Sequence, residues 1–289
     1  MTDRYLFYLD KINRSLSEYC PGEGGVLAES MSYSLSAGGK RIRPVLTLAF
    51  CEACGEDPDK ALTFACALEM IHTYSLIFDD LPCMDNDTLR RGKPTCHVVY
   101  GEANALMAGS GLNAEAFLIA SSPEVDLPDS VKVQALSVLA RASGKDGIVG
   151  GQVLDLENDG RRSLSEREVR TIHRMKTSAM LEAAALLGCL AAGANEERKK
   201  SALLFAEKIG LAFQIKDDIL DVTGSAEVLG KTVGKDRAEK KTTFVDLFGI
   251  EKAQALVSAY TSEAKQVLSG FEKTDFLAYL ADMLCSREN

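Results

Sequence analysis

Apolar residues recur at helical spacing along almost the whole chain. A period of 3.6 residues is typical of α-helices, and no stretch of alternating apolar and polar residues is long enough to indicate a strand. Glycine and proline interrupt the pattern at intervals, as at Pro21-Gly22, Gly38-Gly39 and Gly193. The predicted helices cover residues 2–19, 25–37, 43–54, 58–80, 102–120, 129–142, 144–157, 165–192, 197–222, 250–269 and 273–286.

The predicted helices belong to one domain. No linker rich in serine, glycine or proline divides the chain, whose 289 residues are 46% hydrophobic and therefore sufficient for one large core. Residues 181–194, LEAAALLGCLAAGA, are apolar on more than one face, which is typical of a central helix in a bundle. The sequence predicts an all-α protein in which residues 1–289 form a single-domain helical bundle.

A first acidic cluster stands where the apolar helix of residues 58–80 ends. Asp79 and Asp80 continue the inward-facing stripe of this helix, so we expect their carboxylates to point into the bundle. Asp79 and Asp85 are about 240° apart around an ideal helix, so they converge only if the helix is interrupted. Pro82 supplies that interruption. We therefore expect Asp79 and Asp85 to lie together.

A second acidic cluster has the sequence DDILD, in which Asp217 and Asp221 stand a turn apart on one helix face. Like charges in a helix-lined interior are costly unless something neutralises them. Each cluster taken alone could be a solvated helix end, but two clusters on apolar stripes disfavour that interpretation. With only three histidines in the chain, the clusters favour a hard cation with oxygen ligands such as Mg²⁺, which commonly shares a phosphate oxygen.

Basic residues accompany both clusters. GGKRIRP, at residues 38–44, places three cations on a glycine-rich turn before a helix, which is typical of an oxyanion site. The other cations near the clusters are Arg90, Arg91, Lys176, Lys231, Lys235, Lys240 and Lys241. Taken singly, three of these cations are interpreted as ordinary snorkelling or solvated surface groups, namely Arg41, Lys235 and Lys240.

Charge and composition exclude several classes of protein. A net charge of −9 disfavours binding to nucleic acid or anionic membranes. The N-terminus has no signal peptide, and no run approaches the ~18 apolar residues of a membrane span. Eight cysteines stand mostly in helical patterns, which indicates a reducing compartment. We expect a cytoplasmic protein with no nucleic-acid partner and no stable membrane insertion.

Together these motifs resemble the trans-prenyltransferases, the family of polyprenyl diphosphate synthases. The segments that carry the resemblance are GGKRIRP, DDLPCMDND, LRRGKPT, GGQVLD, HRMKTSAML, FQIK with DDILD, and LGKTVGKD. Within the family, the chain is most similar to bacterial farnesyl diphosphate synthases and their geranylgeranyl relatives. The resemblance implies the helical bundle of isoprenoid synthases with a central substrate cavity, and a homodimer.

The resemblance also implies a reaction. In this family an allylic diphosphate, such as dimethylallyl or geranyl diphosphate, loses pyrophosphate to leave a carbocation. Isopentenyl diphosphate attacks that cation head to tail, and a proton is then lost. Three Mg²⁺ ions activate the leaving group. The metal ligands carried over from the family are Asp79, Asp85 and Asp217, with Asp80 and Asp221 in support.

The resemblance assigns the substrate-binding residues by position. Those implied for isopentenyl diphosphate are Lys40, Arg43, His72 and Arg91. Those implied for the allylic diphosphate are Arg90, Lys176, Thr177, Gln214, Lys231 and Lys241. Thr177 and Gln214 also face the developing cation, and Gln152 and Asp155 are expected to orient Lys176.

By resemblance, Tyr74 and Ser75, which precede Asp79 by five and four residues, occupy the positions that set product length in the family. The resemblance implies that an aromatic residue there shortens the cavity. Tyr74, together with the two-residue expansion of the first motif at Pro82-Cys83, favours a C15 product, farnesyl diphosphate. Geranylgeranyl diphosphate is an alternative product, and a non-catalytic subunit of a heteromeric synthase is an alternative function. The chain departs from the family pattern at Phe78, often a histidine, and at Ser110, usually an aspartate. The change at Ser110 is expected to alter the cavity wall or the surroundings of the metals.

Overall fold

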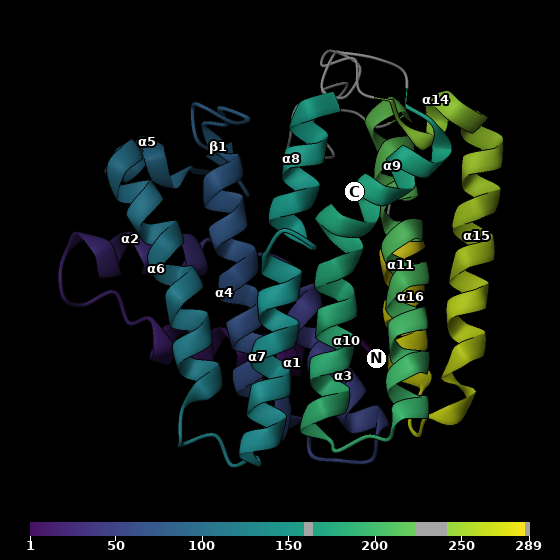
Figure 1. Ribbon diagram of the computed structural model, residues 1–289, viewed down its shortest axis with the longest axis horizontal. Coiled ribbons are helices and arrows are strands. Elements are labelled where there is room, and N and C mark those ends of the chain that lie inside the picture. Colours follow the sequence, from purple (N-terminus) through teal and green to yellow (C-terminus); the bar gives the residue numbers. More distant parts are fainter. Residues whose placement is uncertain (159–163, 224–241, 287–289) are drawn as a thin grey trace. The chain divides into compact units, whose positions relative to one another are not determined.

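The computed structural model describes residues 1–158, 164–223 and 242–286 (Figure 1). The contacts divide the chain into two compact units, one made of Met1–Leu139 with Leu187–Gly193 and the other of Ala140–Leu186 with Ala194–Asn289. Within the described residues both units are helical, apart from one short hairpin in the first. The predicted all-α class is confirmed, whereas the single domain stays a prediction.

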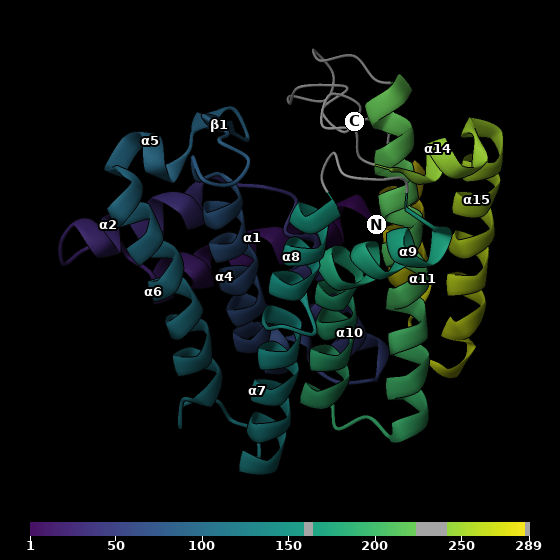
Figure 2. The ribbon, with the colours of Figure 1, turned by 45° about the horizontal axis from the view of Figure 1, so that its top comes forward.

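The first unit is built around helix α4. Its elements are α1 (Thr2–Tyr19), α2 (Val26–Ser36), α3 (Ile42–Ala53), a 3₁₀ turn (Pro58–Ala61), α4 (Leu62–Asp79), β1 (Leu89–Arg90), β2 (Lys93–Pro94), α5 (Cys96–Tyr100), α6 (Glu102–Ser121) and most of α7 (Asp129–Ser143). Phe64, Leu68 and Ile71 of α4 are fully buried, as expected for a helix that is apolar on all sides. Helix α6 runs beside α4 in both views (Figures 1 and 2).

One segment of this unit is long and apolar enough to span a membrane, contrary to the expectation that no such segment exists. By length and composition, Pro58–Asp79 could cross a membrane, with a mean hydropathy of 1.4 in its most apolar window. However, 72% of that window is buried inside the protein. A core helix is apolar for the same reason as a membrane helix, because its surroundings on every side are apolar.

The second unit carries the long helix α11. Its elements are α8 (Ile148–Asn158), α9 (Glu166–His173), a π-helical turn (Arg174–Ser178), α10 (Ala179–Ala191, whose last residues belong to the first unit), α11 (Glu196–Thr223), α14 (Phe244–Phe248), α15 (Ile250–Gln266), a 3₁₀ turn (Val267–Gly270) and α16 (Asp275–Ser286). Helices α11 and α15 lie side by side (Figures 1 and 2). Phe205 and Ile209 of α11 are buried in this packing.

Most predicted helices agree with the structure to within a few residues, but three short elements were not predicted. Helices α5 and α14 have five residues each, less than two turns, and so show little periodicity. The third element is the hairpin of β1 and β2. Its turn residues Arg91 and Gly92 both have positive φ angles, 54° and 76°, as a tight turn between twisted strands requires.

Candidate active site

Helix α4 ends at Asp79, and the chain turns back at once. The amide N–H of Leu81 donates to the Phe78 carbonyl, and the amide N–H of Asp85 donates to the Asp79 carbonyl at 2.9 Å. Pro82 has no N–H and cannot continue the helix. The turn brings Asp85 back beside Asp79, as the position of Pro82 predicted.

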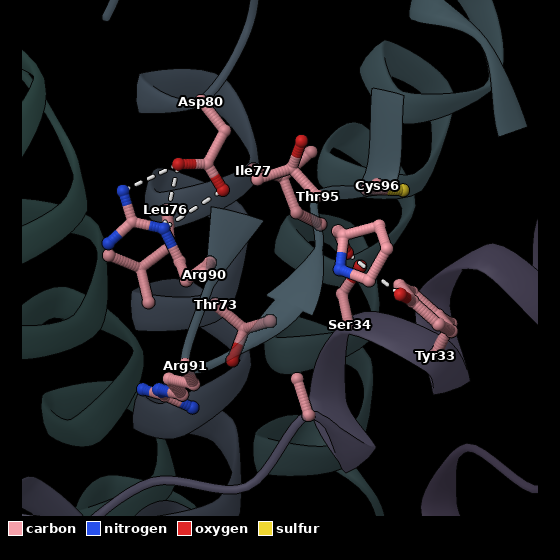
Figure 3. Close-up of a pocket in the computed structure, with 12 residues that line it drawn as sticks. Tyr33, Ser34, Thr73, Leu76, Ile77, Asp80, Arg90, Arg91, Thr95 and Cys96 are labelled. Atoms are coloured by element: carbon pink, nitrogen blue, oxygen red, sulfur yellow. Dashed lines mark hydrogen bonds and ion pairs between the residues drawn. The ribbon is translucent and has the colours of Figure 1, made fainter. Parts of the chain in front are cut away.

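Asp80 is buried and is held by Arg90 at the edge of a small cavity (Figure 3). The Arg90 Nε lies 2.7 and 2.9 Å from the two carboxylate oxygens of Asp80. Burial raises the pKa of the Asp80 carboxyl, and Arg90 opposes this effect. The Arg90 Nη2 also lies 2.5 Å from the Asp80 Oδ1, so two guanidinium nitrogens contact the carboxylate. Such a two-point contact fixes the plane of the guanidinium. Asp80 therefore orients Arg90.

Arg91, one residue further, reaches a different partner. Its guanidinium donates to the Gly38 carbonyl in the turn before α3, and a Cβ at Gly39 would overlap that guanidinium. Gly39 also has a φ of 121°, which strains any residue with a side chain. The hairpin thus directs Arg90 and Arg91 to different partners, and their assignment to different substrates stays a prediction.

Arg43 and His72 form a second basic pair. The Arg43 Nη1 donates to the His72 Nε2 at 3.1 Å, so the ring proton must be on Nδ1. This Nδ1 and the Arg43 Nε are both buried, and neither has a hydrogen-bond partner among the residues that the structure describes. Burial lowers the pKa of the His72 ring well below its usual range, and the nearby arginines lower it further. Buried N–H groups without acceptors, in a field of positive charge, fit an anionic ligand.

Arg41 has a structural role instead. Its Nη1 donates to the Glu69 Oε1 at 2.7 Å, and both side chains are only 2% exposed. The interpretation of Arg41 as a solvated surface cation is wrong, because Glu69 supplies a buried counter-charge. Glu69 is the only acidic residue in the sequence from 62 to 78, so the sequence already indicated a buried carboxylate that would need a cationic partner. Lys40, in contrast, is exposed.

In the second unit, a π-helical turn presents Lys176 and Thr177. The Lys176 Nζ donates to the Asp155 Oδ2 at 2.7 Å, which confirms the expected contact. The Oε1 of Gln152 is buried and has no partner in the described part of the chain, so its expected contact with Lys176 is not formed there. A Cβ at Gly151 would come within 2.5 Å of the Lys176 amide nitrogen, so α8 approaches this closely because it carries a glycine. π-Helical turns occur frequently at functional sites.

On α11, Asp217 and Asp221 lie a turn apart and are half-buried. The Nε2 of Gln214 lies 3.5 Å from the Asp217 Oδ2. The aspartate turned into the core of this unit is Asp218, whose Oδ2 accepts a hydrogen bond from the Phe244 amide at 2.8 Å. Asp218 was not singled out from the sequence, although consecutive helix residues point about 100° apart and only one of a pair can share a face with Asp221.

The two product-length residues are buried in α4. The Ser75 hydroxyl donates to the His72 carbonyl at 2.8 Å. The Tyr74 ring meets the Phe78 ring edge to face, with centroids 5.5 Å apart. Burial raises the pKa of the Tyr74 phenol, and the negative charge of Asp79 raises it further.

Ser110, where the chain departs from the family pattern, lies on α6. Its side chain is exposed, and its hydroxyl donates to the Leu106 carbonyl of the same helix at 2.9 Å. The preceding residue, Gly109, lies against the Phe78 ring of α4. The effect of Ser110 on the cavity wall or on the surroundings of the metals stays a prediction.

Comparison with known proteins identifies the family. The model of the polyprenyl synthetase family matches residues 25–273. The chain belongs to the polyprenyl synthetase family. It is accordingly a prenyltransferase, and the predicted resemblance is confirmed.

Relatives in this family carry two kinds of name. The chain is 47% identical, over 96% of its length, to "Geranylgeranyl pyrophosphate synthase, chloroplastic" of Capsicum annuum, and covers 76% of that protein. It is 44% identical, over 91% of its length, to "Farnesyl diphosphate synthase" of Geobacillus stearothermophilus, and covers 89% of that protein. The crystal structure of an FPP/GFPP synthase from Zymomonas mobilis matches with a TM-score of 0.88 and 34% identity, covering 100% of this chain and 98% of the other. The isoprenoid synthase fold is thereby confirmed.

The aspartates fit the Mg²⁺ that polyprenyl synthetases generally use. Within residues 1–158, 164–223 and 242–286, no three His, Cys, Asp or Glu side chains gather closely enough to hold a metal by themselves. Mg²⁺ does not require that, because it keeps several waters and combines one or two carboxylates with phosphate oxygens. Asp79 with Asp85, and Asp217 with Asp221, offer such pairs. Lys231 and Lys241 lie outside the described residues.

Proposed function

We propose that this prenyltransferase is a short-chain synthase that condenses isopentenyl diphosphate with dimethylallyl or geranyl diphosphate to give farnesyl diphosphate and pyrophosphate. The observation that carries the proposal is the set of nitrogens around His72. Four arginines lower the pKa of the His72 ring, while His72 Nδ1 and Arg43 Nε find no acceptor within residues 1–158, 164–223 and 242–286. A diphosphate supplies both the negative charge and the acceptor oxygens that these groups lack.

The basic residues divide between two diphosphates. Lys40, Arg43, His72 and Arg91 are proposed to bind isopentenyl diphosphate. Arg90, Lys176, Lys231 and Lys241 are proposed to bind the allylic diphosphate, with Thr177 and Gln214 facing the developing cation. The contacts from Asp80 to Arg90 and from Asp155 to Lys176 support the second group, because a cation with a fixed direction loses little entropy on binding.

The aspartates are proposed to hold three Mg²⁺ ions, two at Asp79 with Asp85 and one at Asp217, with Asp80 and Asp221 in support. When bound, Mg²⁺ supplies positive charge that stabilises the departing diphosphate. The turn at Pro82 supports this assignment, because it holds the backbones of Asp79 and Asp85 together before any ligand binds.

A C15 product follows from Tyr74. The ring is buried and braced by Phe78, so it forms a firm floor for a growing chain. A C20 product is the second candidate, because the relative at 47% identity is named a geranylgeranyl pyrophosphate synthase. A single domain with a central substrate cavity belongs to the same proposal.

We also propose a homodimer in the cytoplasm that binds neither nucleic acid nor membranes stably. The homodimer rests on the family resemblance. The exposed side chains of Leu106, Met107 and Leu118 on α6 would provide apolar surface for a second copy. Sedimentation velocity of the pure protein tests this, and a monomer at micromolar concentration would contradict it.

A product assay tests the function. Pure protein is incubated with Mg²⁺, isopentenyl diphosphate and, separately, dimethylallyl, geranyl or farnesyl diphosphate, and product length is read by mass spectrometry. We expect C15 from the first two starters. A C20 product would support the proposed reaction but contradict the proposal that Tyr74 limits the product to C15. No condensation with any starter would favour the non-catalytic subunit.

A further inference from the structure

The Phe78 ring, which packs against Tyr74, also packs against a second helix, α6. Tyr74 and Phe78 are one turn apart on α4, and their planes meet at 81°, the T-shaped geometry that aromatic pairs prefer. On α6, a Cβ added to Gly109 would overlap the Phe78 Cε1 and come within 2.8 Å of its Cδ1. Gly109 is buried, so the Phe78 ring occupies the space that a side chain at Gly109 would need.

The backbone gives no other reason for a glycine at this position. Gly109 is inside helix α6 and is not among the residues with positive φ, so any residue could adopt its conformation. Glycine is a poor helix former compared with alanine, and a buried glycine inside a helix usually has a packing reason. Here the packing partner is the Phe78 ring.

A second glycine on α6 provides a comparison. A Cβ at Gly111 would come within 2.8 Å of the Met31 Sδ on α2. Methionine has three rotatable side-chain bonds and can move aside, whereas the Phe78 ring is confined between Gly109 and the Tyr74 ring. The two glycines therefore lie on the same helix, and a Cβ at either would come within 3 Å of a side chain, but they differ in what that side chain is.

We propose that Gly109 and Phe78 are positioning residues that set product length through Tyr74. The inference rests on the proposed function, in which Tyr74 forms the floor of the cavity. Phe78 fills the space between Tyr74 and α6, so the Tyr74 ring cannot swing aside under a growing chain. Gly109 creates that space for Phe78. Neither residue needs to touch the substrate.

The first test removes the Phe78 ring that supports Tyr74. Phe78→Leu keeps an apolar side chain of similar volume, and Phe78→Ala removes most of it. We expect the ratio of C20 to C15 product to rise about tenfold in Phe78→Ala, because a residue that merely gates an apolar cavity discriminates by factors of this size. We expect a smaller rise in Phe78→Leu. Thermal melts identify any variant that fails to fold, and Phe78→Leu keeps the test valid if Phe78→Ala does.

The second test asks whether Gly109 acts through Phe78. The added methyl of Gly109→Ala should press the ring toward Tyr74 and shift products from C15 toward C10. In the Phe78→Ala background the same substitution should leave the ratio unchanged, because the ring it would press is gone. The matched control Gly111→Ala should leave the wild-type ratio unchanged.

The outcomes separate this inference from the proposed function. If the wild type condenses its substrates but both Phe78 variants make products in the wild-type ratio, the inference is wrong and the proposed function stands. If Gly109→Ala changes the product ratio equally with and without the Phe78 ring, Gly109 does not act through Phe78 and the inference is wrong. If the wild type makes no product from any starter, both proposals fall.

Discussion

Two aspartate doublets show the same pattern of burial. They are Asp79-Asp80 in the first unit and Asp217-Asp218 in the second. In each doublet the first aspartate is half-buried and the second is buried, at 4% exposure for Asp80 and 6% for Asp218. Consecutive residues on a helix point about 100° apart, so one carboxylate of a doublet, here called the outer one, is less deeply buried than the other, here called the inner one. The doublet therefore pairs a candidate metal ligand with a structural carboxylate.

The doublets differ in what satisfies the inner carboxylate and in how the third aspartate returns. Asp80 pairs with a cation, Arg90, whereas Asp218 accepts from a backbone amide. In the first unit the helix stops and a turn brings Asp85 back to Asp79. In the second unit α11 continues and places Asp221 one turn after Asp217. The first arrangement depends on a loop, and the second on helical periodicity alone.

The largest expected effect tests the outer aspartates. Asp79→Asn and Asp217→Asn should each lower kcat by roughly 10²- to 10³-fold, the size of losing one electrostatic contact in a transition state. Thermal melting should hardly change, because both carboxylates are half-buried. Steady-state kinetics at saturating Mg²⁺ measures the effect, with Asp87→Asn as a control in the same loop. Wild-type turnover in either variant would refute the metal assignment.

The next effect concerns the histidine of the second unit. Burial lowers the pKa of His173 from 6.5 to about 4. Above pH 6.5 the ring is neutral in the folded and unfolded states. As the pH falls from 6.5 to 4 the unfolded state takes up a proton and the folded state does not, so the free energy of unfolding falls by on the order of 3 kcal/mol.

His173→Gln should remove this part of the acid sensitivity. Urea denaturation at pH 7, 5.5 and 4.5 compares the variant with the wild type. Carboxylate titration affects both proteins equally, so the difference between them reports His173. Parallel losses of stability in the two proteins would show that His173 is protonated as easily folded as unfolded.

A third prediction contrasts the inner aspartates. Asp218→Ala should lower the free energy of unfolding by about 1–3 kcal/mol, because the Phe244 amide loses its acceptor. Asp218→Asn should restore most of this, since an amide oxygen still accepts. Asp80→Asn should not restore the loss of Asp80→Ala, because Arg90 needs a negative charge. Denaturant melts of the four variants measure these differences in the free energy of unfolding. If asparagine restores stability equally at both sites, the two inner carboxylates do not differ in their need for a negative charge.

The smallest expected effect tests positioning by Asp155. Asp155→Asn should lower kcat/KM for the allylic substrate about tenfold, because Lys176 loses its fixed direction. In a Lys176→Met background the same substitution should have little effect. A tenfold loss in both backgrounds would mean that Asp155 acts on the substrate or the fold without Lys176.

Two parts of the site were predictable, on different grounds. The position of Pro82 indicated, by local chemistry, the turn that joins Asp79 to Asp85. The contact of Asp155 with Lys176 was implied by the resemblance of GGQVLD to the family. The contact of Arg91 with Gly38 was not predictable, because it depends on an Arg91-Gly92 turn too short to show a strand pattern. The role of Arg41 also required the structure, since its partner Glu69 lies 28 residues away in the chain.

The sequence by itself determined the helices, the family and the aspartates and cations available for chemistry, because periodicity and motif spacing are local properties. The tertiary structure decided how those groups are used. It pairs Asp80 with Arg90 and Asp218 with a backbone amide, and among the described residues it provides no acceptor for the His72 Nδ1. The reason is that burial and pairing depend on which helices pack together, and distant residues meet only in the folded chain.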